Sequence, residues 1–375
     1  MTGVELFVQI LKSWDVPFVA TLCGHGMDGI DEACHRAGLP LVDVRNEQAA
    51  GYMAEAYGRF TGRIGVCAVS SGVAHANGLT GVLNALFDGA PMLLITGCGP
   101  TETIGRGHFQ DFDQVGMAAS VCKFTAMIFR PDHIPHILHT ACNTAVNGRP
   151  GPVHITFPIN IQASEVDPDV IKGYEKRPDR ISASGDADLV DKAALMISCA
   201  KRPLLIAGGG VHYAHGAVAL GELAGEQGIP VMTPIWDRGS VPKPMKEYVG
   251  VCGAATGGPD LLAQADLLIV TGAACDYRVG YLQPPGIAED AEVIRIDADP
   301  VQLHQGRMAD VSILGDPRSV LKQLNDACGR LDHQPHTEWM EEAAAQRLTY
   351  TQRCLESRAL AEQGTHALDI VNAVK

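Results

Sequence analysis

The segment from Val44 to Arg59 reads VRNEQAAGYMAEAYGR and decides the fold. It begins at the end of a short apolar run, 41–44, and its small and apolar residues then recur at helical spacing. The same order returns downstream, where the apolar run 64–69 is broken by Ser70-Ser71-Gly72 and followed by a helical pattern. Strands that alternate with helices predict an α/β protein with a parallel sheet.

Two groups of apolar runs predict two such sheets. The first group predicts strands at 16–20, 41–44, 64–69, 91–96 and 153–156, and the second at 203–207, 230–232, 265–270, 292–297 and 311–314. The stretch 97–121 is expected to be irregular. We therefore expect two three-layer α/β domains at 1–162 and 186–330, a linker at 163–185, and a helical tail at 331–375.

Length and charge limit the classes of function. A chain of 375 residues suggests two domains at roughly 150 residues each. Apolar residues make up 46% of the chain, which excludes global disorder. The net charge is −14, from 29 basic and 43 acidic residues, and no cluster of Lys or Arg interrupts it. Nucleic acid and anionic membrane surfaces are therefore poor partners, and a small molecule or another protein is preferred.

The cysteines and the N-terminus bear on the compartment. The eleven cysteines are odd in number and include no Cys-x-x-Cys pair, so we expect reduced thiols and no metal motif. No apolar run reaches the roughly 18 residues of a spanning segment. Residues 1–5, MTGVE, lack the basic start of a signal peptide. These features together predict a cytoplasmic protein.

Candidate ligand-binding residues lie where predicted strands end. Glu47 follows one strand and Ser71-Gly72 follows another. Open α/β sheets bind ligands beyond the carboxyl ends of their strands, which is where both segments are expected. Each also has an ordinary structural interpretation. An acid in the first turn of a helix favours the helix dipole, and Ser-Gly is a common strand-to-helix turn.

Taken together, the motifs resemble thiamine-diphosphate enzymes of the acetolactate synthase, benzaldehyde lyase and oxalyl-CoA decarboxylase superfamily. The segments that match its pyrimidine-binding domain are 45–59, 70–77, 90–97, 108–111 and 148–153. The second half is similar to the family's central domain through 208–210, 265–268 and 296–300. This chain departs from the family pattern at Asn46, where many members have His, and at Val73-Ala74, where they have Pro-Gly.

The resemblance implies a thiamine diphosphate site with Glu47 as its acid. In the family the matched Glu hydrogen-bonds N1′ of the aminopyrimidine, and apolar surroundings at the strand end would help the carboxyl hold a proton. Ser71, Gly72 and Asn77 belong to the turn that approaches the pyrimidine ring.

The resemblance also implies which residues face the substrate. Gln110 is the first candidate, and His25 and His108 are candidates for proton relay near pH 7. His75, inside the pyrimidine turn, is a further histidine to consider. A solvated or structural role is an open alternative for each of these histidines.

The second half carries a weaker indication of a nucleotide. Gly208-Gly209-Gly210 follows a predicted strand but lacks the GxGxxG spacing of a dinucleotide loop. In the family, FAD or ADP sometimes occupies the central domain, and Arg278 is similar to an arginine in a loop there. An ordinary surface arginine is an equally good interpretation of Arg278. An NAD-dependent enzyme is a weaker alternative function.

The motif that binds the diphosphate through Mg²⁺ in the family is not recognised. Gly185-Asp186-Ala187 and Gly315-Asp316-Pro317 do not match its Gly-Asp-Gly start, and 366–371 resembles only the helix that introduces that domain. We therefore expect the large subunit of a split lyase, carboligase or 2-oxo acid decarboxylase. A separate small subunit would hold Mg²⁺ and the diphosphate in a homo- and hetero-oligomer that acts on a small carbonyl substrate. The alternative is a regulatory or scaffolding paralogue, or a fragment, without catalysis of its own.

Overall fold

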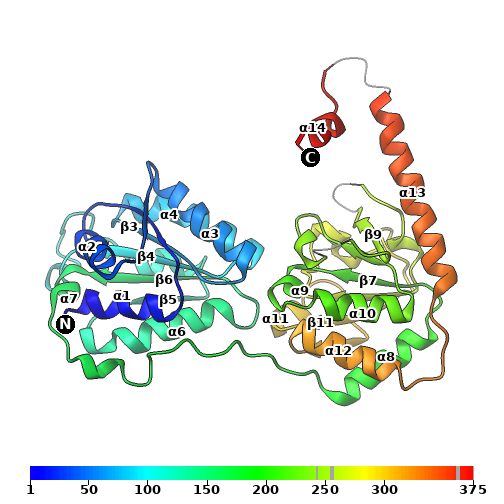
Figure 1. The fold of residues 1–375 in the computed structure, drawn as a ribbon, viewed down its shortest axis with the longest axis horizontal. Helices are drawn as coiled ribbons and strands as arrows, with labels where there is room; N and C mark the ends of the chain where they lie inside the picture. The colour runs from blue at the N-terminus through cyan, green and yellow to red at the C-terminus, as the bar shows by residue number, and fades with distance from the viewer. Residues whose placement is uncertain (242–243, 254–256, 360–363, 375) are drawn as a thin grey trace. The chain divides into compact units, whose positions relative to one another are not determined.

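The computed structural model describes residues 1–241, 244–253, 257–359 and 364–374. The chain divides into two compact units, Met1–Ile181 and Ser182–Lys375, and each contains one six-stranded sheet with helices on its faces (Figure 1). All strand pairings within both sheets are parallel. The α/β class and the two parallel sheets predicted from the sequence are confirmed.

In the first unit the strands follow the order β2-β1-β3-β4-β6-β5. They are β1 (Val19–Leu22), β2 (Leu41–Asp43), β3 (Gly65–Val69), β4 (Met92–Cys98), β5 (Phe124–Met127) and β6 (Pro152–Pro158). Strands β3, β4 and β6 are buried along their whole length, as expected for parallel strands covered on both faces.

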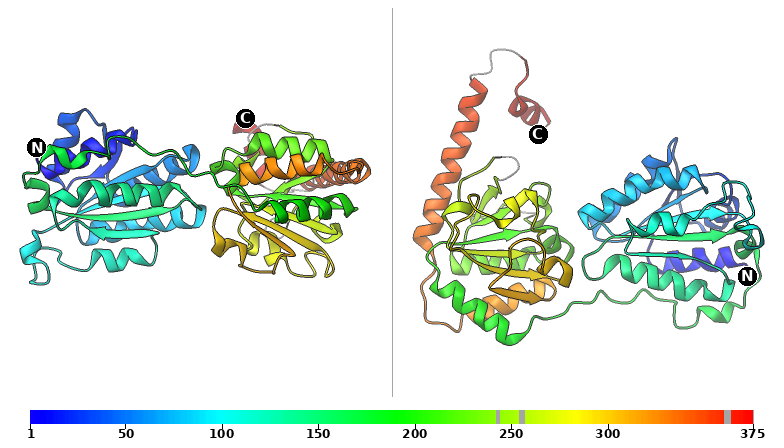
Figure 2. Two further views of the ribbon diagram at one scale, coloured as in Figure 1. Left: turned by 90° about the horizontal axis from the view of Figure 1, so that it is seen from below. Right: turned by 180° about the vertical axis from the view of Figure 1, so that it is seen from behind.

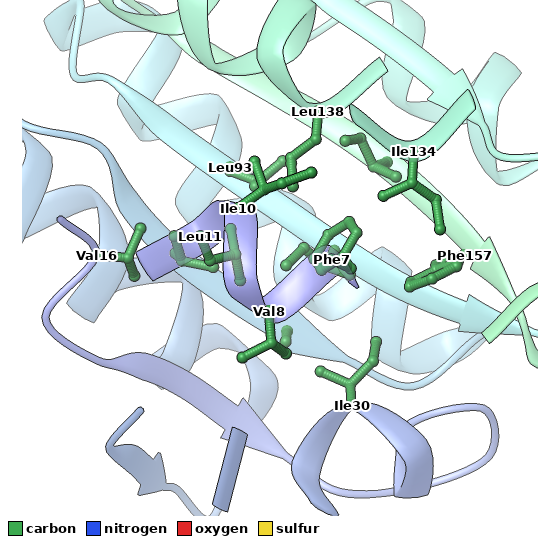
Figure 3. Close-up of a cluster of buried hydrophobic side chains, with 14 of the residues drawn as sticks. Phe7, Val8, Ile10, Leu11, Val16, Ile30, Leu93, Ile134, Leu138 and Phe157 are labelled. Atoms are coloured by element: carbon green, nitrogen blue, oxygen red, sulfur yellow. The ribbon is translucent and has the colours of Figure 1, made fainter. Parts of the chain in front are cut away.

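Two helical layers cover this sheet. The helices are α1 (Gly3–Ser13), α2 (Asp28–Ala37), α3 (Glu47–Thr61), α4 (Val73–Asp88), α5 (Gln114–Ala119), α6 (Ile134–Val146) and α7 (Ile159–Ala163). One face packs against α1, α2 and α6, and the opposite face against α3 and α4. Figure 3 shows the first of these clusters, in which the rings of Phe7 and Phe157 lie 4.9 Å apart.

Three features of the first unit differ from the sequence prediction. The first strand begins at Val19 rather than at 16, because Pro17 has no N–H to donate to a neighbouring strand. The stretch 97–121, expected to be irregular, contains α5. Strand β5 was not predicted, because this edge strand is only half-buried along its length and shows no continuous apolar run.

The segment after β6 remains attached to the first unit. The Gly3 N–H donates to the Ser164 carbonyl at 2.9 Å, and the Val166 N–H donates to the Met1 carbonyl at 3.0 Å. Farther along, the Ile181 N–H donates to Asn147 Oδ1 at 2.9 Å. Much of the stretch that the sequence marks as a linker therefore lies against the surface of the first unit.

In the second unit the strands follow the order β12-β11-β10-β7-β8-β9. They are β7 (Pro203–Ala207), β8 (Val231–Thr233), β9 (Tyr248–Val251), β10 (Leu267–Thr271), β11 (Glu292–Asp297) and β12 (Val311–Leu314). The sequence analysis missed β9, an edge strand that is mostly half-buried and contains Gly250 at φ 131°. Such a strand lacks the apolar run by which the central strands were found.

The helices of the second unit are α8 (Ala187–Cys199), α9 (Gly209–Tyr213), α10 (Ala217–Gln227), α11 (Pro300–Leu303), α12 (Pro317–Cys328), α13 (Thr337–Ala359) and α14 (Ala367–Val374). Helices α8, α10 and α12 form one layer (Figure 2). The start of α13 packs on the other face, where Trp339 Nε1 donates to the Pro203 carbonyl at 2.9 Å. The predicted final helix is α14, and Lys375 lies outside the described residues.

Short 3₁₀ turns connect several of these elements: η1 (Thr101–Thr103), η2 (Pro131–His133), η3 (Pro168–Ile171), η4 (Arg238–Ser240), η5 (Leu262–Gln264) and η6 (Tyr277–Leu282). All eleven cysteines are free thiols. Among the described residues, no helix combines the length and the hydropathy that crossing a bilayer requires.

Candidate functional site

Four loops meet at the carboxyl edge of the first sheet, because β2, β1, β3 and β4 are neighbours and run parallel. These loops or the helices they introduce carry most of the residues singled out from the sequence: His25 after β1, Glu47 after β2, Ser71 and Gly72 after β3, and His108 and Gln110 after β4. Parallel pairing therefore assembles candidates that lie far apart in the chain.

The carboxylate of Glu47 is oriented by a neighbouring helix. Asn77 Nδ2, on α4, donates to Glu47 Oε2 at 3.0 Å, while Oε1 accepts no hydrogen bond from the described residues. Helices α3 and α4 cross closely enough for this bond because Gly51 and Gly81 meet at the crossing, where a Cβ on either would collide with the other helix. One oxygen of a half-buried carboxylate is thus held in place and the other is open.

Asn46, the departure from the family pattern beside Glu47, has a structural role. Its side chain accepts a hydrogen bond of 2.8 Å from the Gln48 N–H and caps the N-terminus of α3. The cap fixes where the helix begins. Glu47 therefore occupies the first helical position, at the end of the loop from β2.

Gly72, Ser71 and Gln110 form one compact contact between two loops. Ser71 Oγ donates to Gln110 Oε1 at 3.1 Å. Gly72 has φ 64°, and a Cβ there would lie 2.6 Å from the Cβ of Gln110. Gln110 itself has φ 54°, an uncommon conformation for a residue with a side chain, and such strain clusters at functional sites. A glycine is required at 72 for the loop after β4 to lie this close.

His25 and His108 face one another across the same edge. Their ring centroids are 5.3 Å apart, and Nε2 of each ring is buried without a hydrogen-bond partner among the described residues. The His25 backbone is held by Ser70 Oγ, which donates to its carbonyl at 3.0 Å. Imidazoles with unpaired nitrogens can donate to or accept from a molecule that binds against them.

His75 lies in the interior rather than at the edge. Its side chain is completely buried under α4, and its ring centroid is 4.8 Å from that of His154 on β6. Burial lowers the pKa of His75 to about 4. A direct role of His75 on substrate is therefore wrong. Sequence reasoning missed His154, although His154 and Thr156 alternate with apolar residues in the otherwise apolar stretch 153–157, which marks a polar patch on one face of the strand.

Comparison with known proteins identifies the family of this chain. Residues 1–117 match the model of the thiamine pyrophosphate enzyme N-terminal TPP binding domain, and residues 190–324 match that of the thiamine pyrophosphate enzyme central domain. This chain carries the N-terminal and central domains of thiamine pyrophosphate enzymes. The resemblance read from its motifs is confirmed, and neither matched model is the family's C-terminal domain.

Individual relatives agree with this assignment. A probable acetolactate synthase large subunit of Methanocaldococcus jannaschii is 31% identical over 352 residues, which cover 91% of this chain and 58% of the relative. The acetolactate synthase large subunit of Corynebacterium glutamicum is 32% identical over 91% of this chain and 55% of its own length. Human 2-hydroxyacyl-CoA lyase 1 is 29% identical over 90% of this chain and 58% of its own. The chain thus spans a little more than half the length of these relatives.

The N-terminal TPP-binding domain of this chain fits the aminopyrimidine half of thiamine pyrophosphate (thiamine diphosphate). Glu47 offers an open, oriented carboxylate oxygen to a ring nitrogen. Gly72 has no side chain, which lets Gln110 pack against the turn beside this carboxylate. Among the described residues, no group of three or more His, Cys, Asp or Glu side chains is arranged to hold a metal ion.

The central domain uses its glycines and its arginine internally. The Gly210 N–H donates to the Gly272 carbonyl at 2.8 Å, and a Cβ on Gly210 would lie 2.6 Å from Gly272 Cα. The Arg278 guanidinium is 11% exposed and pairs with Asp237 at 3.3 Å and Asp276 at 3.0 Å. The alternative of a surface arginine is therefore wrong. A role of Arg278 toward FAD or ADP stays a prediction.

Proposed function

We propose that this protein is a thiamine-diphosphate-dependent carbon–carbon lyase or carboligase whose first unit supplies Glu47 to the aminopyrimidine. The observation that carries the proposal is the Glu47 carboxylate, held through Oε2 by Asn77 and open at Oε1, beside the Gly72 turn. The names of the relatives, acetolactate synthase and 2-hydroxyacyl-CoA lyase, support this reaction class. When bound, the cofactor supplies the carbon nucleophile and the electron sink.

The residues of this chain bind, orient and hold protons. Glu47 would hold the aminopyrimidine by sharing a proton through Oε1, while Asn77 keeps the carboxylate from rotating away by donating to Oε2. The backbone of Ser71 and Gly72 would help to hold the pyrimidine. A bound ring would shield the half-buried carboxylate from water, which would strengthen its hydrogen bond.

The loop after β4 is proposed to face the substrate. Gln110 is fixed by Ser71 Oγ at 3.1 Å, so its amide can orient a substrate carbonyl or carboxylate. His108 and His25 each carry a buried ring nitrogen without a hydrogen-bond partner among the described residues, and we propose that they relay protons. We propose a 2-oxo acid, a 2-hydroxy ketone or a 2-hydroxyacyl thioester as the substrate.

We propose further that Mg²⁺ and the diphosphate are held by a separate small subunit in a hetero-oligomer. The two Gly-Asp segments of this chain support the proposal, because both aspartates cap helices. Asp186 accepts from the N–H groups of Asp188 and Leu189, and Asp316 accepts from the N–H of Ser319. The alternative is a regulatory or scaffolding protein, for which the arrangement at Glu47 would have no use.

The test is purification of the tagged full chain from its native host with everything bound to it, followed by carboligase and lyase assays of the complex. Glu47→Gln should abolish activity and leave the composition of the complex unchanged. Glu222→Gln, on the exposed side of α10, is the matched control and should keep full activity. Full activity of Glu47→Gln would overturn the assignment of Glu47. Purification without a subunit that binds diphosphate would overturn the proposed heteromer.

A further inference from the structure

A buried polar cluster lies under the first turns of α4, on the opposite face of the sheet from the side chains in Figure 3. It consists of His75 from α4, Thr96 from β4, and His154 and Thr156 from β6. All four side chains are completely buried. The cluster lies in the interior, and none of its four side chains is exposed at the candidate cofactor site.

The hydrogen bonds within this cluster leave three ring nitrogens unused. His154 Nε2 lies 2.8 Å from Thr96 Oγ1 and 3.5 Å from Thr156 Oγ1. Nδ1 of His154 and both nitrogens of His75 have no hydrogen-bond partner among the described residues. Buried polar groups in native proteins are almost always paired, and an unpaired one destabilises the fold. The cluster therefore requires a further hydrogen-bonding species.

The chemistry of the cluster narrows what that species is. Two imidazoles are too few for a structural zinc ion, which takes four protein ligands. An anion would need a cation beside it, and burial lowers the pKa of both histidines, so both rings are neutral at pH 7. A water molecule both donates and accepts, and buried waters usually make about three hydrogen bonds to groups that lack other partners.

We propose that an ordered water molecule bridges a ring nitrogen of His75 to Nδ1 of His154 and makes His75 a positioning residue for Glu47. The bridge would tie the first turn of α4 to β6, which is buried along its whole length. That turn begins at Gly72, and Asn77, which holds Glu47, follows His75 by two residues. The positioning role rests on the proposed function, whereas the water bridge does not.

A double-mutant cycle on the full chain tests the bridge. Native-state hydrogen exchange of the β4 and β6 amides reports the stability of the first unit alone. His75→Leu and His154→Leu should each raise the opening constant about ten-fold, because each leaves polar nitrogens unpaired. The double variant removes both rings, so its opening constant should be only a little larger than that of either single variant. Additive effects of the two substitutions would overturn the bridge.

His139→Leu combined with His154→Leu is the matched control. His139 is also buried in the first unit, but it lies on α6 at the other face of the sheet and its Nε2 lies 2.8 Å from the Tyr174 carbonyl. The effect of His139→Leu on the opening constant should therefore add to the effect of His154→Leu. If a leucine variant does not fold, His75→Phe and His154→Phe replace it in the cycle, with the same criterion of non-additivity.

The positioning role has its own readout. In His75→Leu the amides of residues 75–78 should exchange faster than in the unmodified chain, and kcat of the complex should fall more than KM rises. His75→Gln, which can still bind water, should restore both. Unchanged exchange at residues 75–78 in His75→Leu would overturn the positioning role. Because exchange is measured without substrate, this result is independent of whether Glu47 proves catalytic.

Discussion

Ser71 Oγ donates a hydrogen bond of 3.1 Å to Gln110 Oε1 and so joins the turn after β3 to the loop after β4. The two residues are 39 positions apart, and the bond exists because β3 and β4 are parallel neighbours. It lets one turn serve two purposes. Its backbone faces the proposed pyrimidine site while its side chain positions the proposed substrate residue.

Gly72→Ala should disrupt this contact. The new Cβ would lie 2.6 Å from the Cβ of Gln110, and φ 64° is unfavourable for alanine, so we expect a loss of stability of more than about 1 kcal/mol and at least ten-fold lower activity. Gly38→Ala is the control, because Gly38 has φ 67° but nothing within 4 Å of the added Cβ. It should lower stability by a similar strain and leave activity intact. Thermal unfolding measures the stability, and assays of the complex measure the activity. Equal activity of Gly72→Ala and Gly38→Ala would contradict the prediction.

Asn77→Ala should lower kcat about ten-fold and change the stability of the first unit little. The substitution removes the bond to Glu47 Oε2 from an exposed side chain, so the carboxylate rotates more freely. Asn84→Ala serves as the control, since Asn84 lies two turns later on α4 and its side chain interacts with Asp88 at 3.5 Å and with Glu55, not with Glu47. Steady-state kinetics of the complex measure kcat for both variants. A normal kcat for Asn77→Ala would show that Glu47 does not need the hydrogen bond from Asn77.

The stability of the first unit should fall as the pH drops from about 6.5 to about 4. Burial lowers the pKa of His75 from 6.5 to about 4, so the unfolded chain binds a proton in this range that the folded chain rejects. The contribution is fully present above pH 6.5 and amounts to about 3 kcal/mol at most. Hydrogen exchange of β6 between pH 7.5 and 4 should show a steeper loss for the unmodified chain than for His75→Gln. Equal slopes would exclude this linkage.

Arg278→Ala should destabilise the second unit by about 3 kcal/mol, because it removes a guanidinium that pairs with Asp237 and Asp276 in a poorly solvated place. Arg330→Ala removes an exposed pair with Asp191 and should cost less than about 1 kcal/mol. Hydrogen exchange of the β7 and β10 amides gives both values. Equal effects would mean that the Arg278 pairs are as solvated as the surface pair.

The predicted strands succeeded where burial is complete, and one edge strand of each sheet was missed. Strands β3 and β10 are continuous buried apolar runs, which sequence shows directly. Strands β5 and β9 are edge strands with mostly half-buried side chains. Their strand conformation depends on the hydrogen bonds that β6 and β8 offer them, and no local pattern reports such a neighbour.

The sequence by itself determined the α/β class, the two sheets, and the residues that follow strands, such as Glu47 and Gly72, because strand, turn and helix preferences act over a few neighbouring residues. Only the tertiary structure decided which distant residues meet. Asn77 reaches Glu47 because α3 and α4 cross at a pair of glycines, and His75 turned inward toward His154 because β6 lies beside β4. Such pairings depend on packing across the sheet, and packing has no signature in the order of neighbouring residues.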